Sequence, residues 1–147
     1  MLDDFIETNE INAEIKVFDV EVKTSAQAQM AEKSHPVVKT ILLAHDQGFV
    51  LAILNATQKI DVRLIASLLK TSHVRLATPE EVETVTGYEV GGVPPISIYG
   101  TPTLIDPAIL NSAWVLAGGG TKFSILKIQS KDIITHAYEP VLEKISL

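Results

Sequence analysis

Three segments of this 147-residue sequence combine residue types that can take part in chemistry, and the first contains Lys39. Lys39 stands inside the apolar run 37–43, where a strand would place Lys39 and Ile41 on one face and Val38 and Thr40 on the other. A lysine on a buried strand is costly unless it is paired or faces a cleft. Two interpretations stay open: a side chain that extends to the surface, or a cation that holds a phosphate or polarises a carbonyl.

The second segment is the run Gly91-Gly92-Val93-Pro94-Pro95. Adjacent glycines can take positive φ and let another group approach closely, and the two prolines rigidify the exit of the loop. A rigid loop that exposes N–H groups can hold a carbonyl or an oxyanion. The same residues also make a tight structural turn, and composition alone does not separate these two interpretations.

The third segment is Ala117-Gly118-Gly119-Gly120. It matches neither a phosphate-binding P-loop nor a dinucleotide fingerprint, so it predicts either a chain bend or the floor of a ligand pocket. No Gly-x-Ser-x-Gly elbow is present. The four histidines have no metal-ligand spacing, and we expect no metal site.

Composition narrows the classes of function. The absence of cysteine excludes disulfides, thiolate nucleophiles and cysteine-based metal sites. A net charge of −6 makes the chain a poor general binder of polyanions, so we expect no DNA binding, and RNA contact only through a local basic patch. The acidic start does not predict a signal peptide, and the apolar runs are too short to cross a bilayer. We therefore expect a cytoplasmic protein with no membrane contact.

The elements that must position these segments are mixed in type. Period-two and short apolar runs predict strands, and capping and helical spacing predict helices. The expected strands are 14–22, 37–44, 49–54, 74–77, 96–99, 103–105, 113–116 and 123–128, and the expected helices are a short one at the N-terminus, 24–33, 61–69, 78–87 and 132–138. Strands outnumber helices and include a hairpin at 45–48. The pattern predicts one α+β domain over 1–147, with a mixed, largely antiparallel and barrel-like sheet surrounded by helices.

The same segments resemble the YbaK or prolyl-tRNA-editing family, which is also known as the insertion-domain family. The combination of Thr86-Gly87-Tyr88 with Gly91-Gly92-Val93-Pro94-Pro95 is the most specific part of the resemblance. Weaker matches run along nearly the whole chain, at 22–28, 38–43, 59–62, 76–82, 104–107 and 117–120. The barrel-like sheet surrounded by helices is also the fold that this resemblance implies.

The resemblance implies an activity and its residues. Members of the family hydrolyse the ester of mischarged aminoacyl-tRNA, often alanine or cysteine on the proline tRNA, without a metal or organic cofactor. By resemblance, Lys39 and Gly91 are the catalytic residues: Lys39 holds the 3′-terminal phosphate or sugar, and the Gly91 amide stabilises the oxyanion. The substrate-binding residues implied are Thr24, Gly92, Pro95, Gly118 and Gly119. The implied partners are the aminoacylated tRNA 3′ end and an aminoacyl-tRNA synthetase, and the oligomeric state stays open.

One departure from the family pattern concerns amino-acid specificity. Ser124 stands near a place where better-known bacterial members carry an acidic residue. This departure weakens the carry-over of their amino-acid specificity and leaves open that this chain acts on a different substrate. Two alternatives to a deacylase stay open. One is a non-catalytic module on the same fold that binds a nucleotide, a tRNA end or a protein. The other is hydrolysis of a different small ester or thioester.

Overall fold

The computed structural model describes residues 1–22 and 35–147. The helices are α1 (Leu2–Thr8), α3 (Val62–Leu69), α4 (Pro79–Thr86) and α5 (Ser130–His136), with a 3-10 helix at Pro107–Asn111. The strands are β1 (Glu14–Val17), β2 (Val38–His45), β3 (Gly48–Asn55), β4 (Val74–Leu76), β5 (Thr103–Ile105), β6 (Trp114–Gly118), β7 (Ser124–Gln129) and β8 (Pro140–Leu142). The helix expected over 24–33 falls outside the described residues.

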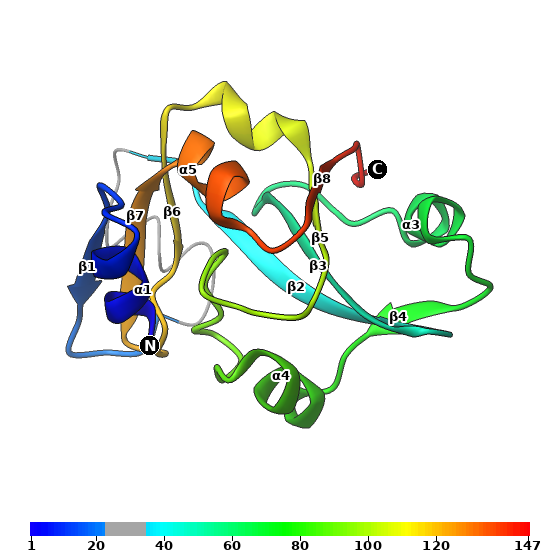
Figure 1. The fold of residues 1–147 in the computed structure, drawn as a ribbon, viewed down its shortest axis with the longest axis horizontal. Helices are drawn as coiled ribbons and strands as arrows, with labels where there is room; N and C mark the ends of the chain where they lie inside the picture. The colour runs from blue at the N-terminus through cyan, green and yellow to red at the C-terminus, as the bar shows by residue number, and fades with distance from the viewer. Residues whose placement is uncertain (23–34) are drawn as a thin grey trace.

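The strands form two sheets that lie side by side (Figure 1). An antiparallel sheet has the order β1-β7-β6, and a mixed sheet has the order β4-β2-β3-β5-β8, in which β3, β5 and β8 run parallel. Among the described residues, one parallel bridge, between Val37 and Leu116, joins the two sheets. The predicted α+β class and mixed sheet are confirmed. The sheet is not closed as a barrel, because β1, β4 and β8 end the two strand orders as edges.

The hairpin of β2 and β3 is the centre of the larger sheet. Eight residue pairs join the two strands, from Val38 and Asn55 to His45 and Gly48. The two-residue connection matches the predicted hairpin. Both faces of the hairpin are covered, so residues 50–54 are all buried. This explains why β3 shows a continuous apolar run rather than an alternating one.

Two hydrophobic clusters account for that burial. The larger cluster includes Leu51 and Ile53 of β3 together with Val115 of β6 and Leu126 of β7, and it joins the two sheets. The smaller cluster packs the other side of the hairpin against Ile65 of α3. Burial of such side chains contributes about 1.5–3 kcal/mol each, and it fixes the frame on which the loops are held.

Helix α4 begins at a capping box and leads to the Gly91 loop. The Thr78 hydroxyl accepts a hydrogen bond from the Glu81 amide, and the Glu81 carboxylate accepts one from the Thr78 amide. The helix ends at Gly87, whose φ of 80° is left-handed. The Thr86 hydroxyl then accepts a hydrogen bond from the Tyr88 amide at 3.1 Å. These bonds confirm the predicted helix start and fix the direction of the chain toward Gly91.

Some predicted elements differ from the structure. Residues 96–99 form no strand; the Ser97 φ of 71° breaks extended geometry, and the Ser97 hydroxyl bonds the Tyr88 hydroxyl at 2.9 Å. Strand β1 ends at Val17, five residues before the predicted end. Strand β8 was not predicted: it has only three residues, all exposed, and its parallel ladder with β5 defines it.

Candidate functional site

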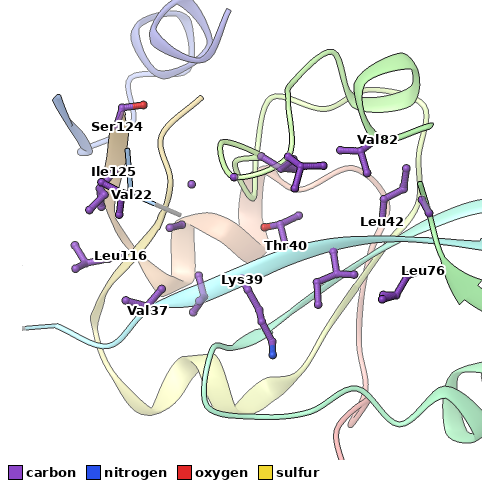
Figure 2. Close-up of a pocket in the computed structure, with 18 residues that line it drawn as sticks. Val22, Val37, Lys39, Thr40, Leu42, Leu76, Val82, Leu116, Ser124 and Ile125 are labelled. Carbon is purple, nitrogen blue, oxygen red and sulfur yellow. The ribbon is translucent and has the colours of Figure 1, made fainter. Parts of the chain in front are cut away.

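A cavity of about 380 Å³ opens beside β2 (Figure 2). Its described walls come from five segments that are distant in the sequence: 37–42, 76–77, 90–91 with Val93, 116–118 and 124–125, with Val22 and Val82 in addition. Most of these side chains are aliphatic, and Lys39, Thr40 and Ser124 are the polar side chains among the described lining residues. The cavity is therefore an apolar pocket with few polar groups, which is typical of a small-molecule site.

The cavity exists because one edge of β2 is covered at both ends but not in the middle. At one end, Leu116 of β6 donates its amide to the Pro36 carbonyl at 2.9 Å. At the other end, β4 pairs with residues 43–45, and the Ala77 amide donates to the Leu42 carbonyl at 3.0 Å. Within the described residues, no strand pairs with 38–41 on that edge. The tertiary arrangement of β4 and β6 leaves this gap.

Lys39 lies at the edge of the cavity, but its ammonium group points away from the centre. In Figure 2 the Lys39 and Thr40 side chains leave β2 on opposite sides. The Lys39 Nζ donates to the Gln58 carbonyl at 2.6 Å and to the Ala56 carbonyl at 3.4 Å. Burial lowers the pKa of Lys39, and the positive charge of Lys59 lowers it further. The cation is thus held against the turn that follows β3.

Gly91 stands at the mouth of the cavity, with its backbone exposed. Its φ is +95°, a conformation that side-chain-bearing residues rarely adopt. A Cβ at this position would meet nothing closer than the Lys122 Cγ at 3.6 Å. The described part of the chain offers no hydrogen-bond acceptor to the Gly91 amide, whereas the Gly92 amide donates to the Glu89 carbonyl at 3.0 Å. The Gly91 N–H is therefore available to a ligand.

The other glycines of the site allow close backbone packing. A Cβ on Gly92 would lie 2.7 Å from the Thr121 carbonyl carbon, and one on Gly119 would lie 2.6 Å from the Ser124 carbonyl carbon. A Cβ on Gly118 would overlap the Val93 carbonyl oxygen. Gly118 lines the cavity; Gly92 and Gly119 lie behind its wall.

Of the residues implied by the family resemblance, Lys39, Gly91 and Gly118 meet at one cavity. Gly92, Gly119 and Pro95 are not among its lining residues, and Pro95 is buried in the loop. Thr24 falls outside the described residues. The 117–120 run predicted either a chain bend or the floor of a pocket. The structure shows both, since Gly118 lines the cavity and Gly119 packs behind it.

Ser124 lines the cavity, but its hydroxyl is used within its own turn. It accepts a hydrogen bond from the Thr121 amide at 3.1 Å and lies 2.8 Å from the Thr121 hydroxyl. It also contacts the Thr121 carbonyl at 3.3 Å. Ser124 therefore closes the turn between β6 and β7 and has little capacity left for a ligand.

Thr40 is a cavity residue that motif reasoning missed. Its Oγ1 atom is buried and has no hydrogen-bond partner within residues 1–22 and 35–147. The only signal in the sequence is strand alternation, which places Thr40 on the face opposite to Lys39. Only the structure shows that this face borders a cavity.

The mouth of the cavity beside Gly91 is acidic. A second hollow there is lined by Glu21, Glu83 and Glu89 together with Lys122, whose ammonium lies 3.8 Å from the Glu89 carboxylate. Among the described residues, no group of three or more histidines and carboxylates is arranged to hold a metal ion. No helix in that part of the chain is long and apolar enough to cross a membrane.

Comparison with known proteins gives the family. The sequence model of the aminoacyl-tRNA editing domain matches residues 19–135. The proline–tRNA ligase of Halalkalibacterium halodurans is 26% identical over 91 residues, which cover 62% of this chain and 16% of the ligase. The ligase of Nitratidesulfovibrio vulgaris is 26% identical over 105 residues, covering 69% of this chain and 18% of the ligase. The chain thus matches less than a fifth of each of these ligases.

Solved structures share the fold. The crystal structure of a proposed trans-editing enzyme for prolyl-tRNA synthetase has a TM-score of 0.90 and 23% identity, and the match covers 99% of this chain and 94% of that one. A structure described as a hypothetical protein has a TM-score of 0.86 and 21% identity over 99% of both chains. Because the family model matches most of the sequence, the chain belongs to the aminoacyl-tRNA editing domain family.

Proposed function

We propose that the protein is an aminoacyl-tRNA deacylase that hydrolyses the ester of mischarged tRNA, such as alanine or cysteine on the proline tRNA. The observation that carries the proposal is the apolar cavity whose mouth holds the Gly91 amide, to which the described residues offer no acceptor. Membership of the editing domain family supports it, as does the prolyl-tRNA ligase relationship of two similar proteins.

The chemistry follows from what the cavity contains. The amino acid lies in the apolar pocket, and the Gly91 N–H donates to the ester carbonyl, whose oxygen becomes negatively charged as water attacks the carbon. The C–O bond to the ribose then breaks, which releases the free amino acid and returns a proton to the ribose hydroxyl. No carboxylate or histidine lines the described cavity, so the proton acceptor is a group on the substrate or a second water.

Lys39 acts, in this proposal, on the phosphate side of the substrate. Its ammonium group lies near Lys59, and the repulsion between the two cations lowers the pKa of Lys39 in addition to the larger effect of burial. A phosphate next to both ammonium groups would relieve that repulsion. Since the hollow beside Gly91 carries Glu83 and Glu89, RNA is expected to approach from the lysine side.

The test is a deacylation assay with proline tRNA charged with alanine, cysteine or serine. The native protein should hydrolyse at least one of these esters well above background. Lys39→Met should raise KM, since it removes the cation that holds the phosphate, while the exposed Lys131→Met on α5 should leave the rate unchanged. No hydrolysis of any of the esters would contradict the proposal.

A second candidate function is a binding module that holds an aminoacylated tRNA end without cleaving it. The observation in its favour is that the Lys39 ammonium already bonds the Gln58 and Ala56 carbonyls, and therefore has a structural role in the free protein. Tight binding of uncleaved aminoacyl-tRNA, with no release of amino acid over hours, would favour this candidate over the deacylase.

A further inference from the structure

Three polar side chains line the described part of the cavity, and of these only Thr40 has a polar group without a hydrogen-bond partner among the described residues. Its oxygen is buried, whereas the Lys39 ammonium is bound to carbonyls and the Ser124 hydroxyl is bound to Thr121. A buried hydroxyl left without a partner costs about 1–3 kcal/mol. This cost is returned when a ligand supplies a hydrogen-bonding atom.

The backbone of Thr40 faces the same open edge. The Leu42 carbonyl, two residues further along β2, points to that edge because it accepts from the Ala77 amide. The Ile53 carbonyl, opposite Thr40, points the other way, because it accepts from the Asp106 amide. By the two-residue repeat of a strand, the Thr40 N–H and C=O also point into the gap between β4 and β6. Thr40 thus presents both a hydroxyl and a backbone pair to the cavity.

We infer that Thr40 determines amino-acid specificity by hydrogen-bonding the side-chain hydroxyl of a small aminoacyl group, so that the preferred substrates carry serine or threonine. This inference rests on the proposed function and deepens it. The remaining walls are largely aliphatic, which disfavours charged side chains. Alanine or valine fits such walls but leaves the Thr40 hydroxyl unpaired, and a site built around a hydrogen bond discriminates against analogues that lack it.

The experiment compares four esters on one proline tRNA: serine with alanine, and threonine with its isostere valine. Thr40→Val removes the hydroxyl at nearly constant shape, and Thr40→Ser keeps the hydroxyl. For the native protein, kcat/KM should be about 5- to 100-fold higher for threonine than for valine, the ratio that corresponds to one hydrogen bond. The ratio should fall to about one in Thr40→Val and persist in Thr40→Ser.

A contact between Thr40 and the α-ammonium group would give a different result. Thr40→Val would then lower kcat/KM for all four esters by the same factor, and the threonine-to-valine ratio would not change. That outcome overturns the inference, as does a native ratio near one.

The thermal stability of Thr40→Val distinguishes a ligand-binding role of the hydroxyl from a structural role. Because the hydroxyl has no hydrogen-bond partner among the described protein groups, Thr40→Val should keep or raise the melting temperature without ligand. A fall of several degrees would show that the hydroxyl supports the fold, and would overturn the inference.

A binding measurement distinguishes failure of the specificity inference from failure of the proposed hydrolysis. Adenosine carrying serine or alanine through a 3′-amide cannot be hydrolysed as an ester, and calorimetry measures its affinity directly. Suppose that no ester is cleaved, that the seryl amide binds more tightly than the alanyl amide, and that Thr40→Val removes this difference in affinity. The specificity inference is then supported, and the deacylase proposal is contradicted. Equal affinity for the two amides overturns the inference whether or not the esters are cleaved.

Discussion

Gly91 and Gly118 line the same cavity, yet the structure uses them for opposite reasons. Gly91 is exposed, has a φ of +95° and has space for a side chain, so the fold needs the conformation of this glycine and not its small size. Gly118 has no positive φ, and a Cβ there would overlap the Val93 carbonyl oxygen. The fold needs Gly118 for the close contact of two backbones. A glycine at a site is therefore not by itself a catalytic glycine.

The two glycines are parts of one assembly. The loop that carries Gly91 packs on the turn after β6, where the Gly120 amide donates to the Gly92 carbonyl at 2.8 Å. Gly118 and its neighbours let the loop lie this close, and the loop then holds the Gly91 amide at the cavity mouth. Changes at the two positions should consequently separate stability from activity.

The largest expected effect is that of Gly118→Ala. The added methyl group overlaps backbone rather than a flexible side chain, so the loop must move, and we expect a loss of about 3 kcal/mol or more. Thermal unfolding measures the loss. Gly48→Ala is the control for backbone strain without overlap: its φ is +143°, but a Cβ there meets nothing within 4 Å, so we expect a smaller loss than for Gly118→Ala. A native melting temperature for Gly118→Ala would remove the distinction between the two glycines.

Gly91→Ala should reduce activity much more than stability. The positive φ costs a side-chain-bearing residue about 1–2 kcal/mol, and any shift of the amide should lower kcat by about 10²- to 10³-fold, as for other lost oxyanion donors. Gly100→Ala is the matched control, because its φ is +83°, its Cβ meets nothing within 4 Å and it does not line the cavity. Equal loss of activity in both variants would contradict the role of Gly91.

A smaller effect is expected at the lysine edge of the cavity. Lys59→Met removes one of the charges that lower the pKa of Lys39, so that pKa should rise, although burial should still hold it below its ordinary value. Nuclear magnetic resonance of labelled lysine side chains measures the change. Since the lowered pKa makes Lys39 lose its proton at lower pH than an ordinary lysine, the variant should keep its Lys39 cation to higher pH. No change in the pKa would show that the two ammonium groups do not interact.

The smallest effect concerns the helix that leads to Gly91. The Arg75 guanidinium, followed by the Thr78 amide, lowers the pKa of Glu81 from 4.5 to about 2. A carboxylate with a lowered pKa stabilises the fold above its ordinary pKa, and this contribution is lost as the pH falls toward the folded value. Glu81→Gln should therefore melt slightly below the native protein at pH 7, and the difference should shrink between pH 4.5 and about 2. A difference that does not depend on pH would exclude this cause.

Local sequence signals predicted the elements that have local causes. The capping residues Thr78 and Glu81, the tight connection at 45–48 and the helical spacing of 62–69 each correspond to an observed element. Residues 96–99 did not form the expected strand, because tertiary contacts hold Ser97 at positive φ. Strand β8 was missed because a parallel partner distant in the sequence defines it.

The sequence alone determined that a lysine on an apolar strand, a glycine–proline loop and a glycine run are the unusual segments of this protein, because those residue types restrict burial and backbone conformation wherever they occur. Only the tertiary structure decided how each is used. Strands β4 and β6 meet the edge of β2 at its two ends, which opens the cavity and gives Thr40 its place there. Contacts between distant segments decide which amide lacks an acceptor and which glycine has another backbone segment packed against its Cα. Such contacts leave no local pattern in the sequence.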